Sequence, residues 1–231
     1  MTSSTLRKTL FEDRPGLART IPFALYMLFL GARPALEPLL PVGSGRWLYA
    51  AQIGSVMLAL AVLWGHYHEL VERPVSIVRN SLVAVAVGLL VFILWINLDV
   101  PVLSLGQPDV QAPLDASGRL DWAWLIVRVF GAAVVVPVME ELFWRSFIMR
   151  WLASGDFRNV LPAAVGMRAL LVSSLVFGLE HNLWFAGLLA GLAYGWLYGR
   201  IGNLWWPILA HATTNLILGA WVIATGSWQF W

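Results

Sequence analysis

Two adjacent glutamates and an arginine lie inside an apolar stretch of the sequence. Glu140 and Glu141 follow Val138 and Met139, and Arg145 comes four residues after Glu141. On a helix, Glu141 and Arg145 would share a face with the acid on the N-terminal side, which is the favourable order for an ion pair. Glu140 would point about 100° away around the helix, given 3.6 residues per turn. The pattern predicts one paired carboxylate and a second one, Glu140, that is available for proton transfer.

Two later apolar stretches carry histidines. His181 ends the run Phe177–His181, and His211 stands four residues before Asn215, which would place both on one face of a helix. Each of these groups alone is more simply interpreted as an interhelical hydrogen-bond partner. Two glutamates, two histidines and an amide on three separate segments, however, supply a base, a proton carrier and hydrogen-bond donors. The combination favours a site for water-mediated acyl hydrolysis over a set of structural contacts.

The composition around these groups is typical of a membrane protein. The chain has 231 residues, of which 59% are hydrophobic and 12% are charged, and its mean hydropathy is +0.73. Soluble domains carry about 25% charged residues, so much of this surface must face lipid. The sequence contains no cysteine, which excludes disulfides, thiolate nucleophiles and cysteine-ligated zinc. The predicted fold is an all-α, polytopic transmembrane helix bundle.

Apolar stretches of about 20 residues can cross the hydrocarbon core, which is about 30 Å thick. We expect about seven spans, within a range of six to eight, in a single transmembrane domain over residues 20–223 whose motifs lie at about 120–220. Residues 1–19 would form a cytoplasmic N-terminal segment. Arg33-Pro34 and Glu37-Pro38 interrupt the first span, which predicts a short span followed by an interfacial piece. The expected spans are 20–40, 47–64, 78–98, 121–150, 167–181, 183–199 and 203–223.

The distribution of basic residues predicts the orientation, because cytoplasmic loops are enriched in lysine and arginine. With the N-terminus in the cytoplasm, ten basic residues fall on the inner side and three on the outer side. We therefore expect an integral protein of the bacterial inner (plasma) membrane with a cytoplasmic N-terminus. The outer three are Arg33, Arg46 and Arg119, and the inner ten are Arg7, Lys8, Arg14, Arg19, Arg73, Arg79, Arg150, Arg158, Arg168 and Arg200.

Counting from the inner ends of the spans places His181 deeper than Glu140. Glu140 lies about 15 Å from Arg150 along its helix, whereas His181 lies about 20 Å from Arg168. The fifth helix must therefore be tilted or shortened to bring the two groups level. We expect a helix break at 180–183, which a membrane protein tolerates where the backbone lines a polar cavity.

Two other patterns have simpler explanations. The run His68-Glu69-Leu70-Val71-Glu72 departs from the zinc-binding pattern HExxH, because its fifth residue is glutamate. Together with His66 it could gather a metal ion, but a solvated segment beside the membrane is the simpler interpretation. Glycines also recur every four residues on the sixth span, which predicts close helix packing. They are Gly187, Gly191, Gly195 and Gly199.

The three polar motifs together resemble the CPBP family of intramembrane proteases, named for CAAX-protein processing and bacteriocin processing. The similarity to the family's EExxxR, FxxxH and HxxxN is carried by Glu140-Glu141-x-x-x-Arg145, Phe177-x-x-x-His181 and His211-x-x-x-Asn215. The resemblance covers about residues 120–220. The short chain and its 14 tryptophans are also similar to the exosortase-associated, CAAX-protease-related branch.

The resemblance implies an intramembrane peptidase, a CAAX-type glutamic endopeptidase that cleaves a membrane-associated protein or peptide. It implies that Glu140 and His181 activate the attacking water. It also implies that His211 and Asn215 hydrogen-bond the developing oxyanion, with the ion pair of the first motif as support. The implied partners are the lipid bilayer and a membrane protein or lipidated peptide substrate, with no nucleic acid. The narrower branch would add exosortase-system proteins.

Two alternatives stay open. Two histidines and a glutamate are also a zinc ligand set with water in the fourth position, so the expected cofactor is none, with zinc as the alternative. Buried acids and histidines also serve as proton relays, which makes a non-enzymatic transporter or scaffold the second class. Transporters often contain internal repeats with paired broken helices, and the sequence has no such symmetry.

Overall fold

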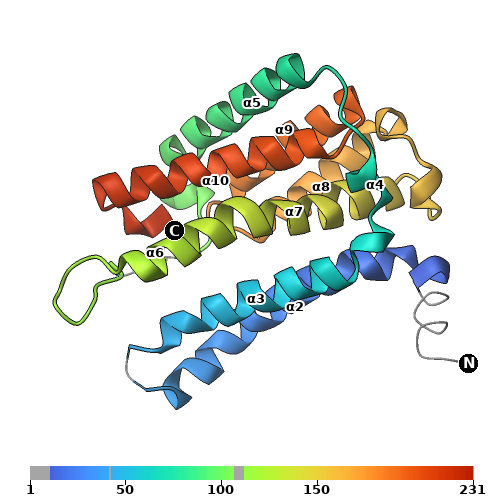
Figure 1. The fold of residues 1–231 in the computed structure, drawn as a ribbon. Coiled ribbons are helices and arrows are strands. Elements are labelled where there is room, and N and C mark those ends of the chain that lie inside the picture. The colour runs from blue at the N-terminus through green and yellow to red at the C-terminus, as the bar shows by residue number, and fades with distance from the viewer. Residues whose placement is uncertain (1–10, 42, 107–111, 231) are drawn as a thin grey trace, which may run out of the picture. The chain divides into compact units, whose positions relative to one another are not determined.

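The computed structural model describes residues 11–41, 43–106 and 112–230 (Figure 1). Regular structure within these residues is helical, and the backbone pairing of strand type is limited to one isolated bridge between Leu114 and Leu120. The all-α prediction is confirmed. The chain forms two compact units, Met1–Glu72 and Arg73–Trp231. A single transmembrane domain over residues 20–223 remains a prediction.

The first unit is a helical hairpin. Its helices are α2 (Pro15–Leu36) and α3 (Leu48–Val62), and the single-turn helix α4 (His68–Val71) follows them (Figure 1). Pro15 lies in the first turn of α2, where its missing N–H has no helical partner to lose. The hairpin accounts for the first two predicted spans.

The break expected in the first span at Arg33-Pro34 does not occur. Helix α2 continues through Pro34 to Leu36 and only then passes into a 3₁₀ turn, Glu37–Leu39. Pro34 removes one backbone donor, and the helix ends within a turn of it, so few hydrogen bonds depend on that position. The predicted interruption was therefore wrong at Arg33-Pro34, whereas the α-helix does end directly before Glu37-Pro38.

A buried ion pair closes the hairpin. Arg19 on α2 binds Glu69 on α4 through Nε–Oε1 at 2.7 Å and Nη2–Oε2 at 2.6 Å, and the two side chains are only 2% and 9% exposed. The Tyr67 hydroxyl donates to the Ala18 carbonyl at 2.8 Å, and burial raises the pKa of Tyr67 above its ordinary value. Glu69 thus has a structural partner. The expectation of a solvated segment was wrong for this residue.

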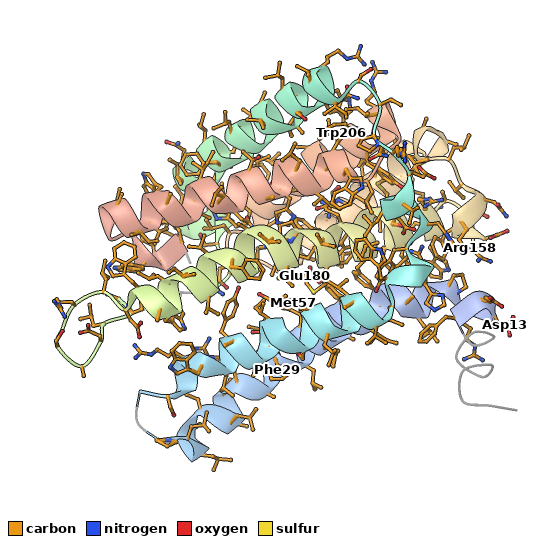
Figure 2. All side chains as sticks on the ribbon, in the orientation of Figure 1. Asp13, Phe29, Met57, Arg158, Glu180 and Trp206 are labelled. Atoms are coloured by element: carbon orange, nitrogen blue, oxygen red, sulfur yellow. The ribbon has the colours of Figure 1, made fainter. Side chains whose placement is uncertain are left out.

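The second unit contains the remaining long helices. Helix α8 packs chiefly against α9, and α10 packs chiefly against α5. Large apolar side chains remain exposed along α5, including Val78 and Leu82, as expected of a helix that faces lipid. Figure 2 shows the described side chains on the ribbon, with those of α5 extending from the helix. In chain order the elements are α5 (Ile77–Asn97), α6 (Trp122–Phe130), η5 (Gly131–Val135), α7 (Val136–Glu141), η6 (Leu142–Met149), α8 (Met167–Leu179), α9 (Trp184–Ile201) and α10 (Trp205–Thr225).

The fourth predicted span is a helix in which α-helical and π-helical turns alternate. It begins at Asp121, whose Oδ1 accepts a hydrogen bond from the Trp124 amide at 3.1 Å, and it runs to Met149. The stretches η5 and η6 are π-helical. Glu140 and Glu141 are the last two residues of α7, the α-helical segment that lies between η5 and η6. Inserted π-turns are frequent at functional sites, because they reorient side chains without ending the helix.

The lengths and compositions of the helices fit a chain that is embedded in a membrane. Five of those in the described residues are long and apolar enough to cross a bilayer, and α8 is apolar but has only 13 residues. The chain is an integral membrane protein. Each of the seven predicted spans corresponds to a helix of the structure. The five candidate spans are Pro15–Leu39, Gly45–Val62, Ile77–Asn97, Trp122–Met149 and Trp205–Thr225.

Helix α8 ends early, as the depth of His181 required. It stops at Leu179, and α9 begins at Trp184, so the predicted break at 180–183 is confirmed. The two helices then run in close contact, since a Cβ added at Gly178 would lie 2.6 Å from the Trp184 carbonyl oxygen. A Cβ added at Gly191 would lie 2.9 Å from the Cα of Ser174. The close packing predicted from the glycine spacing is confirmed at this contact.

Candidate active site

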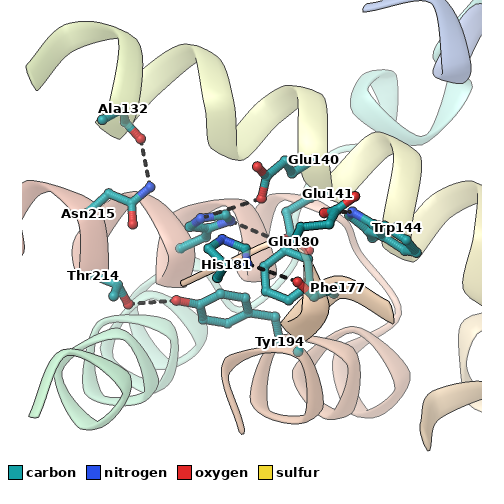
Figure 3. A network of polar contacts seen from close by, with 12 residues as sticks. Ala132, Glu140, Glu141, Trp144, Phe177, Glu180, His181, Tyr194, Thr214 and Asn215 are labelled. Carbon is teal, nitrogen blue, oxygen red and sulfur yellow. Dashed lines mark hydrogen bonds and ion pairs between the residues drawn. The ribbon is translucent and has the colours of Figure 1, made fainter. Parts of the chain in front are cut away.

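Two carboxylates of α7 flank one imidazole of α10. His211 lies with Nδ1 3.0 Å from Glu141 Oε1 and Nε2 4.0 Å from Glu140 Oε2. All three side chains are buried, with Glu141 fully inaccessible. Figure 3 shows the carboxylates of Glu140 and Glu141 directed toward the helix that carries Thr214 and Asn215. The first and third motifs, far apart in sequence, therefore form one cluster.

Arg145 completes a chain of contacts that orients His211. Its Nε lies 3.2 Å from Glu141 Oε2, which confirms the predicted ion pair. Its Nη2 donates to the Gly191 carbonyl at 3.4 Å, and the guanidinium lies over the Phe177 ring at 4.3 Å. Because Glu141 is ion-paired, it can only accept from His211, so Nδ1 carries a proton. The remaining nitrogen, Nε2, is the one directed at Glu140.

Glu140 differs from Glu141 in having no such partner. Its Oε2 is buried without a hydrogen bond in the part of the chain that the structure describes, and 4.0 Å to His211 exceeds hydrogen-bond range. A buried acceptor left unpaired costs about 1–3 kcal/mol. Such a penalty is tolerated where the group acts on a water molecule or a substrate. The predicted ion pair of Glu141 is therefore present, whereas the availability of Glu140 for proton transfer remains a prediction.

His181 joins the cluster through Phe177. Its Nδ1 lies 2.9 Å from the Phe177 carbonyl oxygen. A carbonyl only accepts, so Nδ1 donates and Nε2 of the neutral ring keeps the lone pair. The ring also contacts the rings of Phe177 at 4.8 Å and Trp95 at 5.3 Å. Among the described residues, no hydrogen bond or ion pair links His181 directly to Glu140, so the pairing on the water implied by the resemblance remains a prediction.

Asn215 is anchored to the π-helical turn η5. Its Nδ2 donates to the Ala132 carbonyl at 2.8 Å, one turn along α10 from His211 (Figure 3). A π-turn displaces the usual carbonyl partners, and Asn215 binds one of the carbonyls that result. The amide keeps a second N–H, since only one of its two hydrogens faces Ala132. Its role toward an oxyanion remains a prediction.

Tyr194 supports His211 and was missed by the sequence reasoning. The two rings stack with centroids 5.0 Å apart and planes inclined by 20°. The Tyr194 hydroxyl donates to Thr214 Oγ1 at 2.7 Å, and Thr214 in turn lies 2.9 Å from the Gly88 carbonyl oxygen on α5. Tyr194 lies on α9 between two of the regularly spaced glycines, and no pattern in the sequence marks it. Its packing fixes the imidazole plane.

A second missed contact involves the turn after α8. Glu180 Oε2 accepts a hydrogen bond from Trp144 Nε1 at 3.1 Å (Figure 3). Trp144 lies within the first motif and Glu180 immediately precedes the histidine of the second. The sequence assigns neither residue a role, because nothing local indicates that they meet.

The zinc alternative lacks a ready ligand set. Across the described ranges, no three side chains of histidine, aspartate, glutamate or cysteine lie close enough together to hold a metal ion. His211 Nδ1 is bound to Glu141 and His181 Nδ1 to Phe177. These residues, as placed, do not fit a zinc site, and we derive no step through a metal. Independence of metal remains a proposal.

Comparison with known proteins supports the family predicted from the motifs. Residues 122–217 match the family model described as type II CAAX prenyl endopeptidase Rce1-like. The matched region starts with α6 and ends in α10, so it contains all six predicted site residues, while α2, α3 and α5 lie outside it. The narrower exosortase-associated assignment remains a prediction.

Two curated proteins are similar to the chain. It is 28% identical over 94 residues to "Putative membrane peptidase YdiL" of Bacillus subtilis, which covers 38% of this chain and 34% of YdiL. It is 26% identical over 140 residues to "UPF0177 protein YxdF" of Lactococcus lactis, which covers 58% of this chain and 73% of YxdF. The chain thus spans about a third of the length of YdiL. No solved structure gives a significant match.

Proposed function

We propose that this protein is an intramembrane endopeptidase of the CAAX-protease type, which hydrolyses a peptide bond of a membrane-associated protein or peptide. One observation carries the proposal. A glutamate is held inside the helix bundle with an unpaired carboxylate oxygen, beside a histidine whose other nitrogen is committed to an ion-paired carboxylate. An acid and an oriented imidazole in that arrangement are the elements of general acid–base catalysis.

Glu140 acts as the general base in this proposal. It removes a proton from a water molecule, whose oxygen forms a bond to the scissile carbonyl carbon. His181 accepts the water's second hydrogen bond through Nε2, the nitrogen left free by the bond to Phe177. The tetrahedral intermediate then collapses with cleavage of the C–N bond. Glu140 returns the proton to the leaving amine, so that it is regenerated as a carboxylate.

The oxyanion of the intermediate is bound by α10 in the same scheme. His211 donates from Nε2 when its ring carries a proton on both nitrogens, because Nδ1 already donates to Glu141. Asn215 donates its second amide hydrogen while the first stays on Ala132. In well-studied hydrolases one such donor contributes about 3–4 kcal/mol to the transition state. His211 and Asn215 are therefore expected to be essential for rate.

The scheme is tested by a comparison of membrane peptidomes. Membranes from the native host, carrying either the wild-type chain or Glu140→Gln, are digested and their protein termini compared by mass spectrometry. We expect at least one membrane protein to accumulate uncleaved in the Glu140→Gln strain and to be cleaved by purified wild-type protein in proteoliposomes. The matched control is Glu12→Gln, the same substitution at an exposed glutamate. Cleavage by Glu140→Gln at the wild-type rate would refute the proposal.

A further inference from the structure

We propose that Glu180 and Trp144 are positioning residues that hold the turn between α8 and α9 and so fix the Nε2 of His181 in the site. The inference rests on the proposed function and adds two residues to it. Neither is one of the named residues of the three motifs, and neither contacts the reacting atoms in the scheme above.

The turn needs an anchor because its backbone leaves the helix. After Leu179 the hydrogen bonds shorten to i+3 spacing, from the His181 amide to the Gly178 carbonyl at 3.0 Å. Regular helix resumes only at Trp184. Without the hydrogen bonds of a regular helix, the backbone alone would hold His181 less firmly. Catalytic groups need geometry fixed to within about 0.5 Å, so other contacts must restrain it.

Side-chain and backbone bonds restrain the turn on both sides of His181. Before it, Glu180 Oε2 accepts from Trp144 Nε1 at 3.1 Å, which ties the turn to η6. After it, the Asn182 carbonyl accepts from the Leu105 amide at 2.6 Å, which ties the turn to the segment that follows α5. The bond to Trp144 is made by the side chain of a half-buried residue.

Trp144 also contacts the other end of the histidine motif. Its ring meets the Phe177 ring edge to face, with centroids 6.2 Å apart and planes at 83°. Phe177 is the residue whose carbonyl receives the Nδ1 hydrogen of His181. One indole therefore braces both the residue that sets the tautomer of His181 and the residue that begins the turn. The imidazole also contacts the Trp95 ring in a T-shaped arrangement, with centroids 5.3 Å apart.

Three substitutions separate this role from simple packing. Trp144→Phe keeps an aromatic ring against Phe177 but removes the indole N–H. Glu180→Ala removes the acceptor, whereas Glu180→Gln keeps an acceptor oxygen without the charge. Using the substrate found for the full-length protein, we expect kcat to fall by about 10- to 100-fold in Trp144→Phe and Glu180→Ala, with KM unchanged. Glu180→Gln should recover most of the loss, and the double variant should be no slower than the worse single one.

The matched control is Trp151→Phe, the same change at an exposed tryptophan beyond the end of η6. It should leave kcat and KM at wild-type values. Equal losses in Trp151→Phe and Trp144→Phe, or an unchanged kcat in Glu180→Ala, would overturn the positioning role. Additive losses in the double variant would also overturn it, because residues acting through one bond cannot add.

A spectroscopic measurement keeps the inference separate from the proposed function. In ¹⁵N spectra of the reconstituted protein, the indole signal of Trp144 is identified by its loss in Trp144→Phe. We expect Glu180→Ala to shift that signal and to reduce the fraction of His181 in the Nδ1–H tautomer. If wild-type protein cleaves nothing, the proposed function fails while these shifts still support the contact. If neither signal moves, the inference fails whatever the activity.

Discussion

His211 donates through Nδ1 to Glu141 Oε1 over 3.0 Å, and this bond joins α10 to α7 across 70 residues of sequence. Glu141 is in turn held by Arg145, so the imidazole is oriented by a buried, ion-paired carboxylate. The same arrangement orients the histidine of serine proteases, where the acid fixes the tautomer without leaving its own site. The bond therefore decides which nitrogen of His211 faces Glu140. It makes Glu141 a residue whose loss should impair both folding and rate.

The first prediction concerns Glu141→Gln. We expect processing to fall by about 100-fold or more, because an amide no longer enforces the Nδ1–H tautomer of His211. Removal of one partner of a buried ion pair should also lower the free energy of unfolding by about 3–5 kcal/mol. The measurements are cleavage of the identified substrate and reversible unfolding in detergent.

A double variant separates the two effects of Glu141. Replacing Arg145 as well, in Glu141→Gln/Arg145→Met, removes the uncompensated guanidinium and should restore most of the stability. Activity should stay low, because the amide still does not enforce the Nδ1–H tautomer of His211. Recovery of activity along with stability would mean that Glu141 matters only for folding.

The second prediction is that Glu140→Gln leaves stability unchanged or raises it. The carboxylate oxygen Oε2 of Glu140 is buried and unpaired, so burying it opposes folding. A neutral amide of the same shape removes the charge and should raise the unfolding free energy by about 0–2 kcal/mol. The comparison of thermal unfolding for Glu140→Gln and Glu141→Gln provides the test. Strong destabilisation by Glu140→Gln would indicate a structural carboxylate instead of a catalytic one.

Sequence reasoning located the helices and the local pair but not the long-range partners. The ion pair of Glu141 with Arg145 followed from residue spacing on a helix. The break at 180–183 followed from residue spacing together with the requirement that Glu140 and His181 lie at the same depth. The continuation of α2 through Pro34 did not, since a proline near a helix end has a weak effect. These features are local to one stretch of the chain, so the spacing of residues along that stretch predicts most of them.

Contacts between helices depend on how the helices pack, which no spacing rule encodes. The stacking of Tyr194 on His211 and the bond from Trp144 to Glu180 join residues on different helices. The pair of Arg19 with Glu69, 50 positions apart, turned an apparent solvated motif into a buried structural contact. The sequence could therefore predict which chemical groups form the site. It could not predict which residue orients each of them.

The third prediction concerns Tyr194→Phe. The phenyl ring keeps the stacking on His211, whereas the hydrogen bond to Thr214 Oγ1 is lost. We expect the free energy of unfolding to fall by about 1 kcal/mol, with processing reduced less than about fivefold. Tyr194→Ala, which removes the ring as well, should reduce processing much more, because His211 loses the surface that fixes its plane. Similar activity in the two variants would show that the stacking is unimportant.

The fourth prediction is that metal chelation leaves the activity intact. No three potential ligands converge within the described residues, and both histidines have one ring nitrogen bound elsewhere. Protein dialysed against EDTA and 1,10-phenanthroline should therefore retain its rate, with less than one zinc per ten molecules by elemental analysis. Loss of activity on chelation, restored by stoichiometric zinc, would replace the glutamate mechanism with a metal-dependent one.

The fifth prediction uses the absence of cysteine in the chain to map its orientation. The wild-type protein gives no background with thiol reagents, so a single introduced cysteine reports one position. Ser117 and Ser154 are both exposed, and the bias of basic residues assigns them to the outer and inner sides respectively. In intact cells, a membrane-impermeant maleimide should label Ser117→Cys and leave Ser154→Cys unlabelled until the membrane is permeabilised. The reverse pattern would overturn the cytoplasmic N-terminus, and it would place the end of α10 beyond Asn215 on the inner side.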